Sequence, residues 1–503
     1  MNQAATISMR ARAGRRRGAR PLARFQRRRG AIAIMVAVML AGLVGFIGLA
    51  LDLSRVYNRK AELQSIANVA ALTAARQLNG TSAGVNAATA QAFVAMNGLR
   101  YQYNQLPIDW NEAALSFSAS PNGGWLNAAT ARGAPDGLVY VRVDTSGFGA
   151  PMGTVVLFFM RALSPSLVST VISAVAVAGR STIEVAPLAV CALSNTAAAS
   201  RANPGPPANV ELVQYGFRRG VGYDLMQLNP NGVAAENFVI DPFSPPGTPG
   251  ALANIAPGFV GPYVCTGQLA MPRVMGGTIT VGRAFPLGSL FNQLNSRFDL
   301  YNGALCAYAT APPDTNIKQY TFGSAIPWMG TTPAGQVARS TTAGGKLRTV
   351  ADPLPPPAGT TAPMYGPLWA YARSVPWSSY VAGSEEPAAG YTPFAHNSWG
   401  TLYGPSGPAI TAAYPGGTLT PYKASSGTNF LAPPGAHKGA ANRRVLNVAL
   451  LSCPVGAGAL TTATVLGIGK FLMTVPATAT TVHVEFGGLL SEQSLGGAVE
   501  LYP

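Results

Sequence analysis

Acidic and metal-binding side chains are scarce in this chain. Its 503 residues include 19 Asp and Glu, three His and four Cys, and charged residues make up only 11% of the total. No Cys-x-x-Cys pair occurs, and only His483 has a carboxylate, Glu485, near it on one expected strand. Metal binding and general acid–base catalysis require such groups to converge. We therefore expect no catalytic residue, no metal site and no cofactor.

Two short motifs look catalytic but lack the required context. GTSAG at residues 80–84 matches G-x-S-x-G, yet a helix is expected before it, where a nucleophile elbow needs a strand. GIGKF, which begins at Gly467, lacks the spacing of a phosphate-binding loop. Chance explains both matches better than catalysis does.

Positive charge is concentrated at the N-terminus. The formal net charge is +16, and the first 30 residues contain no acid and ten arginines: Arg10, Arg12, Arg15, Arg16, Arg17, Arg20, Arg24, Arg27, Arg28 and Arg29. Such an arm beside a membrane binds anionic lipid headgroups. Nucleic-acid binding is the alternative, but the arm has one aromatic residue, Phe25, so we expect no nucleic-acid partner.

An uninterrupted apolar run follows at residues 31–51. As a helix it covers about 30 Å, the thickness of a bilayer core, and it lacks the polar stripe of a buried soluble helix. The arginines before it place the N-terminus in the cytoplasm. The run is longer than a cleaved signal and no A-x-A site follows it. We predict a retained signal anchor that crosses a bacterial inner membrane once, with the following residues exported.

Small residues recur every four positions within this span, at Ala33, Ala37, Ala41 and Gly45. This spacing allows a second helix to approach closely. Plain lipid exposure is an equally good interpretation.

The helix is expected to continue beyond the membrane as a stalk. Apolar and small residues follow helical spacing to Leu78, and Asn79-Gly80 offers a cap. Span and stalk together form a predicted helix of about 48 residues and about 70 Å. A second helix is expected at residues 84–96.

Alternating patterns predict strands at residues 114–120 and 138–144. The apolar stretch 155–178 is interrupted by Arg161 and Pro165, so we expect a strand, a short turn or helix, and another strand. A second membrane span is the alternative.

The remainder is rich in loops, because the chain contains 57 Gly and 41 Pro. Strands are predicted at residues 443–453, 461–475 and 480–490. In an oxidising compartment the cysteines can pair, and we prefer Cys265 with Cys306 and Cys191 with Cys453 over four free thiols. The fold class is α+β, divided into a cytoplasmic arm (1–30), a transmembrane anchor (31–51), a stalk with an α/β region (52–185) and an exported β-rich domain (186–503).

Residues 27–78 resemble the TadE/TadG-like proteins of the tight-adherence (Flp) pilus assembly system. The resemblance lies in an Arg/Gly entry to the span, an Asp after it and an alanine-rich run, at Asp52, Arg55, Tyr57, Leu63, Gln64, Ala70, Ala71, Leu72, Ala74 and Ala75. Asn68 stands where the family usually has Asp. A weaker similarity covers residues 158–178.

The resemblance also bears on processing and on metal binding. Pilin-type precursors are cut after a Gly and carry a Glu five residues later, but the fifth residue after Gly30 is Met35, so we expect no cut. Larger relatives carry a D-x-S-x-S metal site, and the corresponding stretch PLAVCALSNTAAAS has no aspartate.

The resemblance implies a pilin-like α/β region and a membrane-anchored structural or assembly component, with no catalysis. Its implied partners are the lipid bilayer and other pilus-assembly or pilin-like proteins, contacted through Asp52, Arg55, Tyr57, Leu63, Gln64, Ala70, Ala71 and Ala74. The alternative is an anchored envelope enzyme or ligand-binding protein with its site in the loops around Trp328, Trp369, Trp377 and Trp399.

Overall fold

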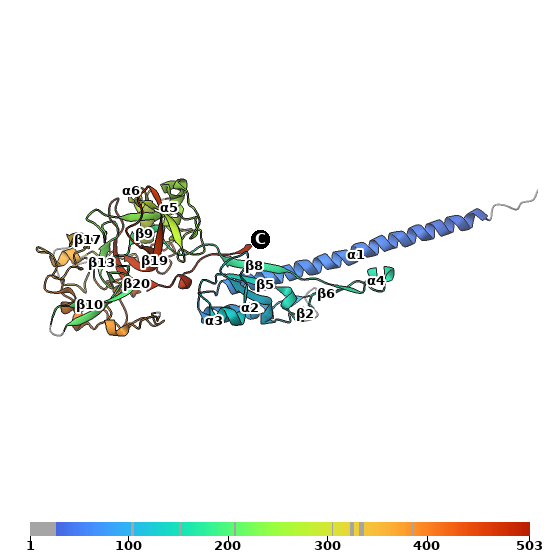
Figure 1. Ribbon diagram of the computed structural model, residues 1–503, viewed down its shortest axis with the longest axis horizontal. Helices are drawn as coiled ribbons and strands as arrows, with labels where there is room; N and C mark the ends of the chain where they lie inside the picture. Colours follow the sequence, from blue (N-terminus) through green and yellow to red (C-terminus); the bar gives the residue numbers. More distant parts are fainter. Residues whose placement is uncertain are drawn as a thin grey trace, which may run out of the picture.

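The computed structural model describes residues 27–101, 105–149, 152–205, 208–303, 305–321, 326–330, 337–384 and 386–503. Most of the arginine-rich arm, residues 1–26, lies outside the described residues. A long helix projects from a small α/β unit, and a larger β-rich unit lies at the opposite end (Figure 1). We call the α/β unit the neck and the β-rich unit, residues 186–490, the head.

Helix α1 runs without interruption over Arg27–Ala75, 49 residues. At 1.5 Å per residue it is about 73 Å long. The predicted continuity of span and stalk is therefore confirmed, although the helix ends three residues earlier than expected. The most apolar 18-residue window of α1 has a mean hydropathy of 2.7, and only 6% of this window is buried. Within the described chain, α1 is the one helix that is long and apolar enough to cross a membrane.

The neck packs the outer part of α1 and helix α2 (Ser82–Asn97) against a sheet of five antiparallel strands. Thr81 caps α2, because its hydroxyl accepts a hydrogen bond of 3.0 Å from the Gly84 N–H. The strands, in spatial order, are β21 (Val499–Tyr502), β8 (Val175–Arg180), β5 (Tyr140–Asp144), β3 (Leu115–Ser118) and β4 (Leu126–Asn127). The second helix and both alternating strands were predicted.

Strand β21 was not predicted in this place. The last strand of the chain returns from the head and pairs with β8, Val499 opposite Arg180 and Tyr502 opposite Val177. The Tyr502 and Tyr140 rings meet edge to face at 5.1 Å. The C-terminal strand therefore belongs to the same sheet as the strands that follow α2.

The interrupted apolar stretch forms a hairpin. Strands β6 (Thr154–Val156) and β7 (Ser169–Val171) pair antiparallel, and the short helix α4 (Met160–Leu163) lies between them. The hairpin extends away from the neck alongside α1 (Figure 1). A strand, a short turn or helix, and one other strand were the expectation here; two strands, β7 and β8, follow α4 instead of one, and a second membrane-spanning helix does not form.

The head contains a seven-stranded sheet, in which five strands close a ring. Each strand of the ring pairs with the next, so these strands leave no open edge within it. The ring strands are β19 (Leu460–Met473), β15 (Thr278–Arg283), β14 (Asn237–Ile240), β9 (Leu188–Cys191) and β18 (Val445–Leu451), and β20 (His483–Leu490) and β13 (Gly222–Asp224) extend it. The three predicted C-terminal strands correspond to β18, β19 and β20.

Side chains alternate between two buried clusters along the ring strands. Ala189 and Cys191 pack in one cluster, while Leu188 and Val190 pack in the other. This is the two-residue period of a strand that is covered on both faces. Helices α5 (Pro257–Thr266) and α6 (Leu287–Asn295) and the long loops supply the cover.

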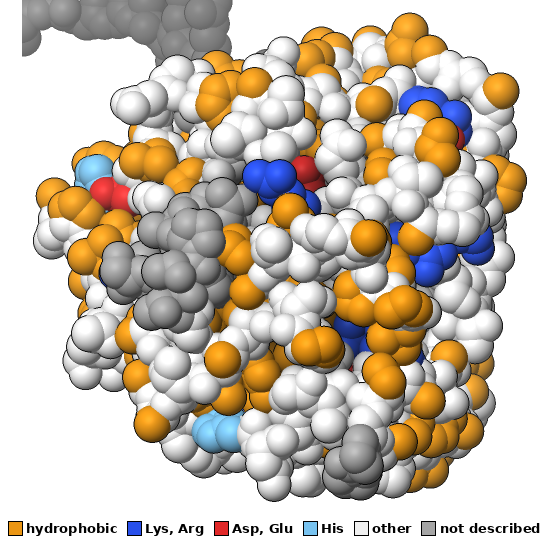
Figure 2. Space-filling model, turned by 90° about the vertical axis from the view of Figure 1, so that its left-hand side faces the viewer, with side chains coloured by type: hydrophobic (Ala, Val, Ile, Leu, Met, Phe, Trp, Pro, Cys, Tyr) orange, Lys and Arg blue, Asp and Glu red, His pale blue; other side chains and the backbone are white. Residues whose placement is uncertain are grey.

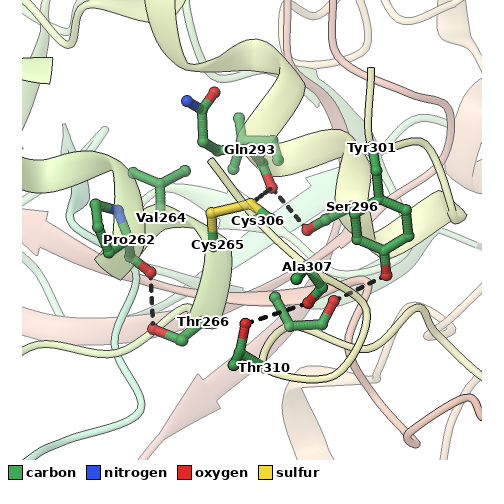
Figure 3. Close-up of a disulfide and its surroundings, with 12 residues drawn as sticks. Pro262, Val264, Cys265, Thr266, Gln293, Ser296, Tyr301, Cys306, Ala307 and Thr310 are labelled. Atoms are coloured by element: carbon green, nitrogen blue, oxygen red, sulfur yellow. Dashed lines mark hydrogen bonds between the residues drawn. A yellow bond between two sulfur atoms is a disulfide. The ribbon is translucent and has the colours of Figure 1, made fainter. Parts of the chain in front are cut away.

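Both expected disulfides form. Cys191, at the end of β9, bonds to Cys453, two residues after the parallel neighbour β18. Cys265 of α5 bonds to Cys306 in the loop after α6, beside Tyr301, whose hydroxyl donates 2.9 Å to the Ala311 carbonyl (Figure 3). Each disulfide connects a regular element to a loop region.

The end of the head that faces away from α1 carries few charges. Hydrophobic side chains are scattered there among neutral polar ones, and Lys and Arg appear as isolated groups (Figure 2). The described residues of this face offer no concentrated charge to a partner.

Candidate functional site at the base of the stalk

The alanine stripe of the stalk lies inside the chain's own fold. Leu63, Ala70, Ala71 and Ala74 are fully buried, in one cluster with side chains of α2, β3, β5 and β8. Small side chains let the sheet approach the helix closely, which explains why alanine recurs here. We predicted these four residues as partner contacts. That prediction is wrong for this structure, because the neck itself occupies the stripe.

Asp52 joins the end of the apolar run to the hairpin. Its side chain is 1% exposed. Its two carboxylate oxygens accept three backbone N–H groups, from Phe158 at 3.1 Å, Phe159 at 2.8 Å and Met160 at 2.7 Å. These are the otherwise unpaired amides at the start of α4, so the carboxylate caps that helix from a distant part of the chain. Asp52 was predicted as a partner contact and is instead internal.

The same junction brings Gly48 and Arg55 against the hairpin. A Cβ atom on Gly48 would lie 2.6 Å from the Cβ atom of Phe159, so only glycine permits this approach. The Arg55 guanidinium lies 4.4 Å from the centre of the Phe158 ring. Cation–π attraction adds to the hydrogen bonds of Asp52. One turn of α1 on either side of Asp52 therefore holds the hairpin.

Polar stalk residues also bond within the chain. Gln64 donates to the Val175 carbonyl at 2.9 Å and to the Asn68 side chain at 3.0 Å. Lys60 donates to the Ser173 carbonyl. Gln64 thus holds the first residue of β8, and Asn68, the departure from the family pattern, accepts one of its hydrogen bonds.

What α1 leaves exposed is a different row of residues. Leu49, Leu53 and Tyr57 are spaced by four residues and are 40%, 50% and 65% exposed. We call these three the exposed ridge. It continues the four-residue spacing of Ala33, Ala37 and Ala41, which are exposed, and Gly45, which is half-buried with nothing within 4 Å of an added Cβ. Of the ridge, the sequence predicted only Tyr57 as a partner contact; the four-residue spacing was the available signal.

The tryptophan-rich loops form core rather than a site. Trp328, Trp369 and Trp399 are buried in the main head cluster. Their indole N–H groups donate to the Leu368 carbonyl, the Tyr403 hydroxyl and the Pro408 carbonyl. Satisfied and buried indoles offer nothing to a ligand. Three of the four tryptophans named for the alternative of an enzyme or binding site therefore belong to the core, whereas Trp377 is half-buried beside Tyr380.

Glu485 anchors one of these loops from β20. Its buried carboxylate accepts N–H groups from Ala370 at 2.6 Å, Tyr371 at 2.9 Å and Ala372 at 2.8 Å. Burial raises the pKa of Glu485 to about 8, although the three hydrogen bonds oppose that rise. Both oxygens are thus occupied by the backbone, so Glu485 does not pair with His483 as a metal ligand.

Possible metal ligands converge at one place in the described chain. Cys191, Cys453 and Glu236 have ligand atoms within 4.8 Å of one another. Both sulfurs belong to a disulfide, however, and offer no thiolate.

Comparison with known proteins gives one match. The Tad family model, described as Flp pilus-assembly TadE/G-like, matches residues 30–77. The expected resemblance is confirmed over this segment, which lies almost entirely on α1 and includes the span, Asp52 and the buried stripe. No curated protein and no solved structure matches the chain.

Proposed function

We propose that this chain is a membrane-anchored structural component of a Tad (Flp) type pilus-assembly apparatus and that it catalyses no reaction. The family match over residues 30–77 carries this proposal, because that segment connects an uncovered apolar helix to a folded neck. Because α1 continues without a break from the proposed membrane span into the core of the neck, it fixes the position of the exported domains relative to the membrane.

The proposed topology follows the charge distribution. The arginine arm (1–30) lies in the cytoplasm, residues 31–51 cross the inner membrane once, and residues 52–503, which form the pilin-like neck and the head, lie in the periplasm or at the surface. Two disulfides suit an oxidising compartment on that side. The arm remains attached, because the fifth residue after Gly30 is Met35.

Partner contacts are proposed on the exposed surface of α1. The ridge of Leu49, Leu53 and Tyr57 is apolar and uncovered, and it follows the small residues Ala33, Ala37, Ala41 and Gly45 of the span. Rows at four-residue spacing form the ridges on which helices pack against one another. A helix of another pilus component would lie along this row, within the membrane and just outside it.

Glutamate substitutions on the ridge test the proposal. Leu53→Glu and Tyr57→Glu place a charge in the proposed contact, and each should strongly reduce the number of surface pili while membrane insertion and both disulfides persist. Val381→Glu, at an exposed apolar position of the head, is the matched control and should leave pili unchanged. Normal pili in both ridge variants would contradict the partner surface; normal pili after deletion of the whole gene would contradict the function.

A further inference from the structure

The hairpin ends in an apolar tip that the described chain does not cover. Leu157 turns inward and donates its N–H to the Val168 carbonyl at 2.9 Å, while the side chains around it remain open to solvent. Phe158 is 60% exposed and Phe159 is 45% exposed. We call the following residues the hairpin tip: Val156, Phe158, Phe159, Leu167 and Val168.

The contacts with α1 fix the position of this tip along the helix axis. Asp52 is the first residue after the apolar run, and Gly48, which touches Phe159, lies inside the run. Leu51, the end of the run, lies three positions after Gly48, which corresponds to about 5 Å along the helix axis. Amphipathic segments that lie in a membrane interface bury their apolar side to roughly 5–10 Å. The tip therefore sits at interfacial depth.

The polar residues of the tip suit the same position. Arg161 is exposed, and Arg55, four positions after the end of the apolar run, lies over the Phe158 ring. Arginines at this level can reach the phosphates of lipid headgroups, while Ser164 and Ser166 satisfy each other at 2.8 Å. Aromatic and aliphatic side chains with arginine beside them are the composition of a segment that rests in an interface.

We propose that the hairpin tip inserts shallowly into the exported-side leaflet of the bilayer that α1 crosses. The acyl chains and headgroups at the leaflet boundary cover Phe158, Phe159 and Leu167. This inference rests on the anchored topology proposed above. A second lipid contact beside α1 limits rotation and tilt of the helix, so it sets the direction in which the exposed ridge faces.

A bilayer is a better occupant than a protein for this surface. The tip is held within about one helical turn of the end of the span, so a membrane around α1 reaches it without any further partner. An exposed apolar surface of this kind next to a span would otherwise remain in water at a cost in free energy.

Depth-dependent quenching tests the proposal on the full-length protein in phosphatidylcholine and phosphatidylglycerol vesicles. All four native cysteines are paired, so an introduced cysteine takes an environment-sensitive fluorophore at one position only. The labelled variants are Phe158→Cys and Val168→Cys at the tip, Leu40→Cys within the span, and Phe93→Cys on α2 as an exposed apolar control away from the tip. Lipids that carry a quencher near the headgroup or near the bilayer centre report depth.

We expect both tip labels to shift to shorter emission wavelength and to be quenched more by the shallow quencher than by the deep one. The Leu40 label should be quenched more by the deep quencher, and the Phe93 label by neither. Unquenched tip labels together with a quenched Leu40 label would overturn the hairpin proposal and leave the anchor intact. An unquenched Leu40 label would overturn the anchor and, with it, this inference.

Discussion

The Asp52 carboxylate accepts a hydrogen bond of 2.8 Å from the backbone N–H of Phe159, 107 residues later in the chain. This bond and its two neighbours connect the end of the apolar run to the tip of a hairpin. A negative charge that is almost fully buried is stable here because it meets three backbone donors at the start of α4.

Asp52→Asn should release the hairpin from α1. Asparagine keeps one acceptor oxygen but loses the charge and the second oxygen, which costs about 1–3 kcal/mol of local stability. Hydrogen exchange of the Phe158, Phe159 and Met160 amides should accelerate accordingly. Glu500→Gln, an exposed acid on β21, is the control and should leave these amides protected. Equal protection in both proteins would show that Asp52 does not hold the hairpin.

Ala70→Glu should unfold the neck, and its neighbour Val69→Glu should not. Ala70 is fully buried, whereas Val69 is 38% exposed on the same helix. An unpaired charge at position 70 is expected to cost more than about 3 kcal/mol, while the surface change should stay within about 0.5 kcal/mol. Limited proteolysis of the neck distinguishes the two. Comparable resistance would mean that the stripe is not packed as described.

Removal of residues 498–503 should destabilise the neck and leave the head intact. Strand β21 makes four cross-strand pairs with β8, and each pair is worth about 0.2–1 kcal/mol, which totals roughly 1–4 kcal/mol. Removal of Pro503 alone, outside the strand, is the control. Proteolysis followed by mass spectrometry should locate the first cuts in the neck; first cuts in the head would contradict the pairing.

Replacement of the cysteine pairs by alanine should destabilise the head unequally. The chain-entropy model assigns about 5.5 kcal/mol to the 262-residue separation of Cys191 and Cys453 and about 4 kcal/mol to the 41-residue separation of Cys265 and Cys306. The double variant of the first pair should therefore melt at a lower temperature. Peptide mapping of the oxidised wild type checks the connectivity first, and a Cys191–Cys265 peptide would refute it.

Glu485 should make the head less stable as pH rises. Its pKa in the folded chain is about 8, against an ordinary value of 4.5, so between these values the folded state retains a proton that the unfolded state has lost. The contribution of Glu485 to the free energy of unfolding therefore falls from about pH 4.5 to pH 8. Glu485→Gln should melt with a flatter pH dependence across this interval, whereas Glu500→Gln should match the wild type. Identical slopes in all three proteins would exclude the effect.

Regular elements with a strong local pattern were predictable in position and type. The apolar run and the alanine spacing predicted one long helix, the two-residue alternation around Val141 predicted β5, and the β-branched runs predicted β18 to β20. These patterns depend on neighbours within a few residues, which the sequence displays directly. The disulfide pairing was also anticipated, because two of the cysteines end strand-like runs.

The sequence did not predict which surfaces the chain's own fold covers and which remain exposed. A stripe of alanines looks the same whether a partner or the chain's own sheet covers it, and here β5 and β8 cover it. The four-residue spacing of Leu49, Leu53 and Tyr57 was visible in the sequence, but its exposure depended on where the neck packs. The position of β21, 319 residues after the strand it pairs with, left no local signal.

The sequence by itself determined the long apolar helix, its expected orientation in a membrane and its continuation as a stalk, because length, hydropathy and charge asymmetry act locally along the chain. Only the tertiary structure decided that Asp52 and the alanine stripe face inward and that the hairpin tip lies beside the span. Those outcomes depend on contacts between residues far apart in the sequence, where several surfaces compete for the same apolar face and the best packing prevails.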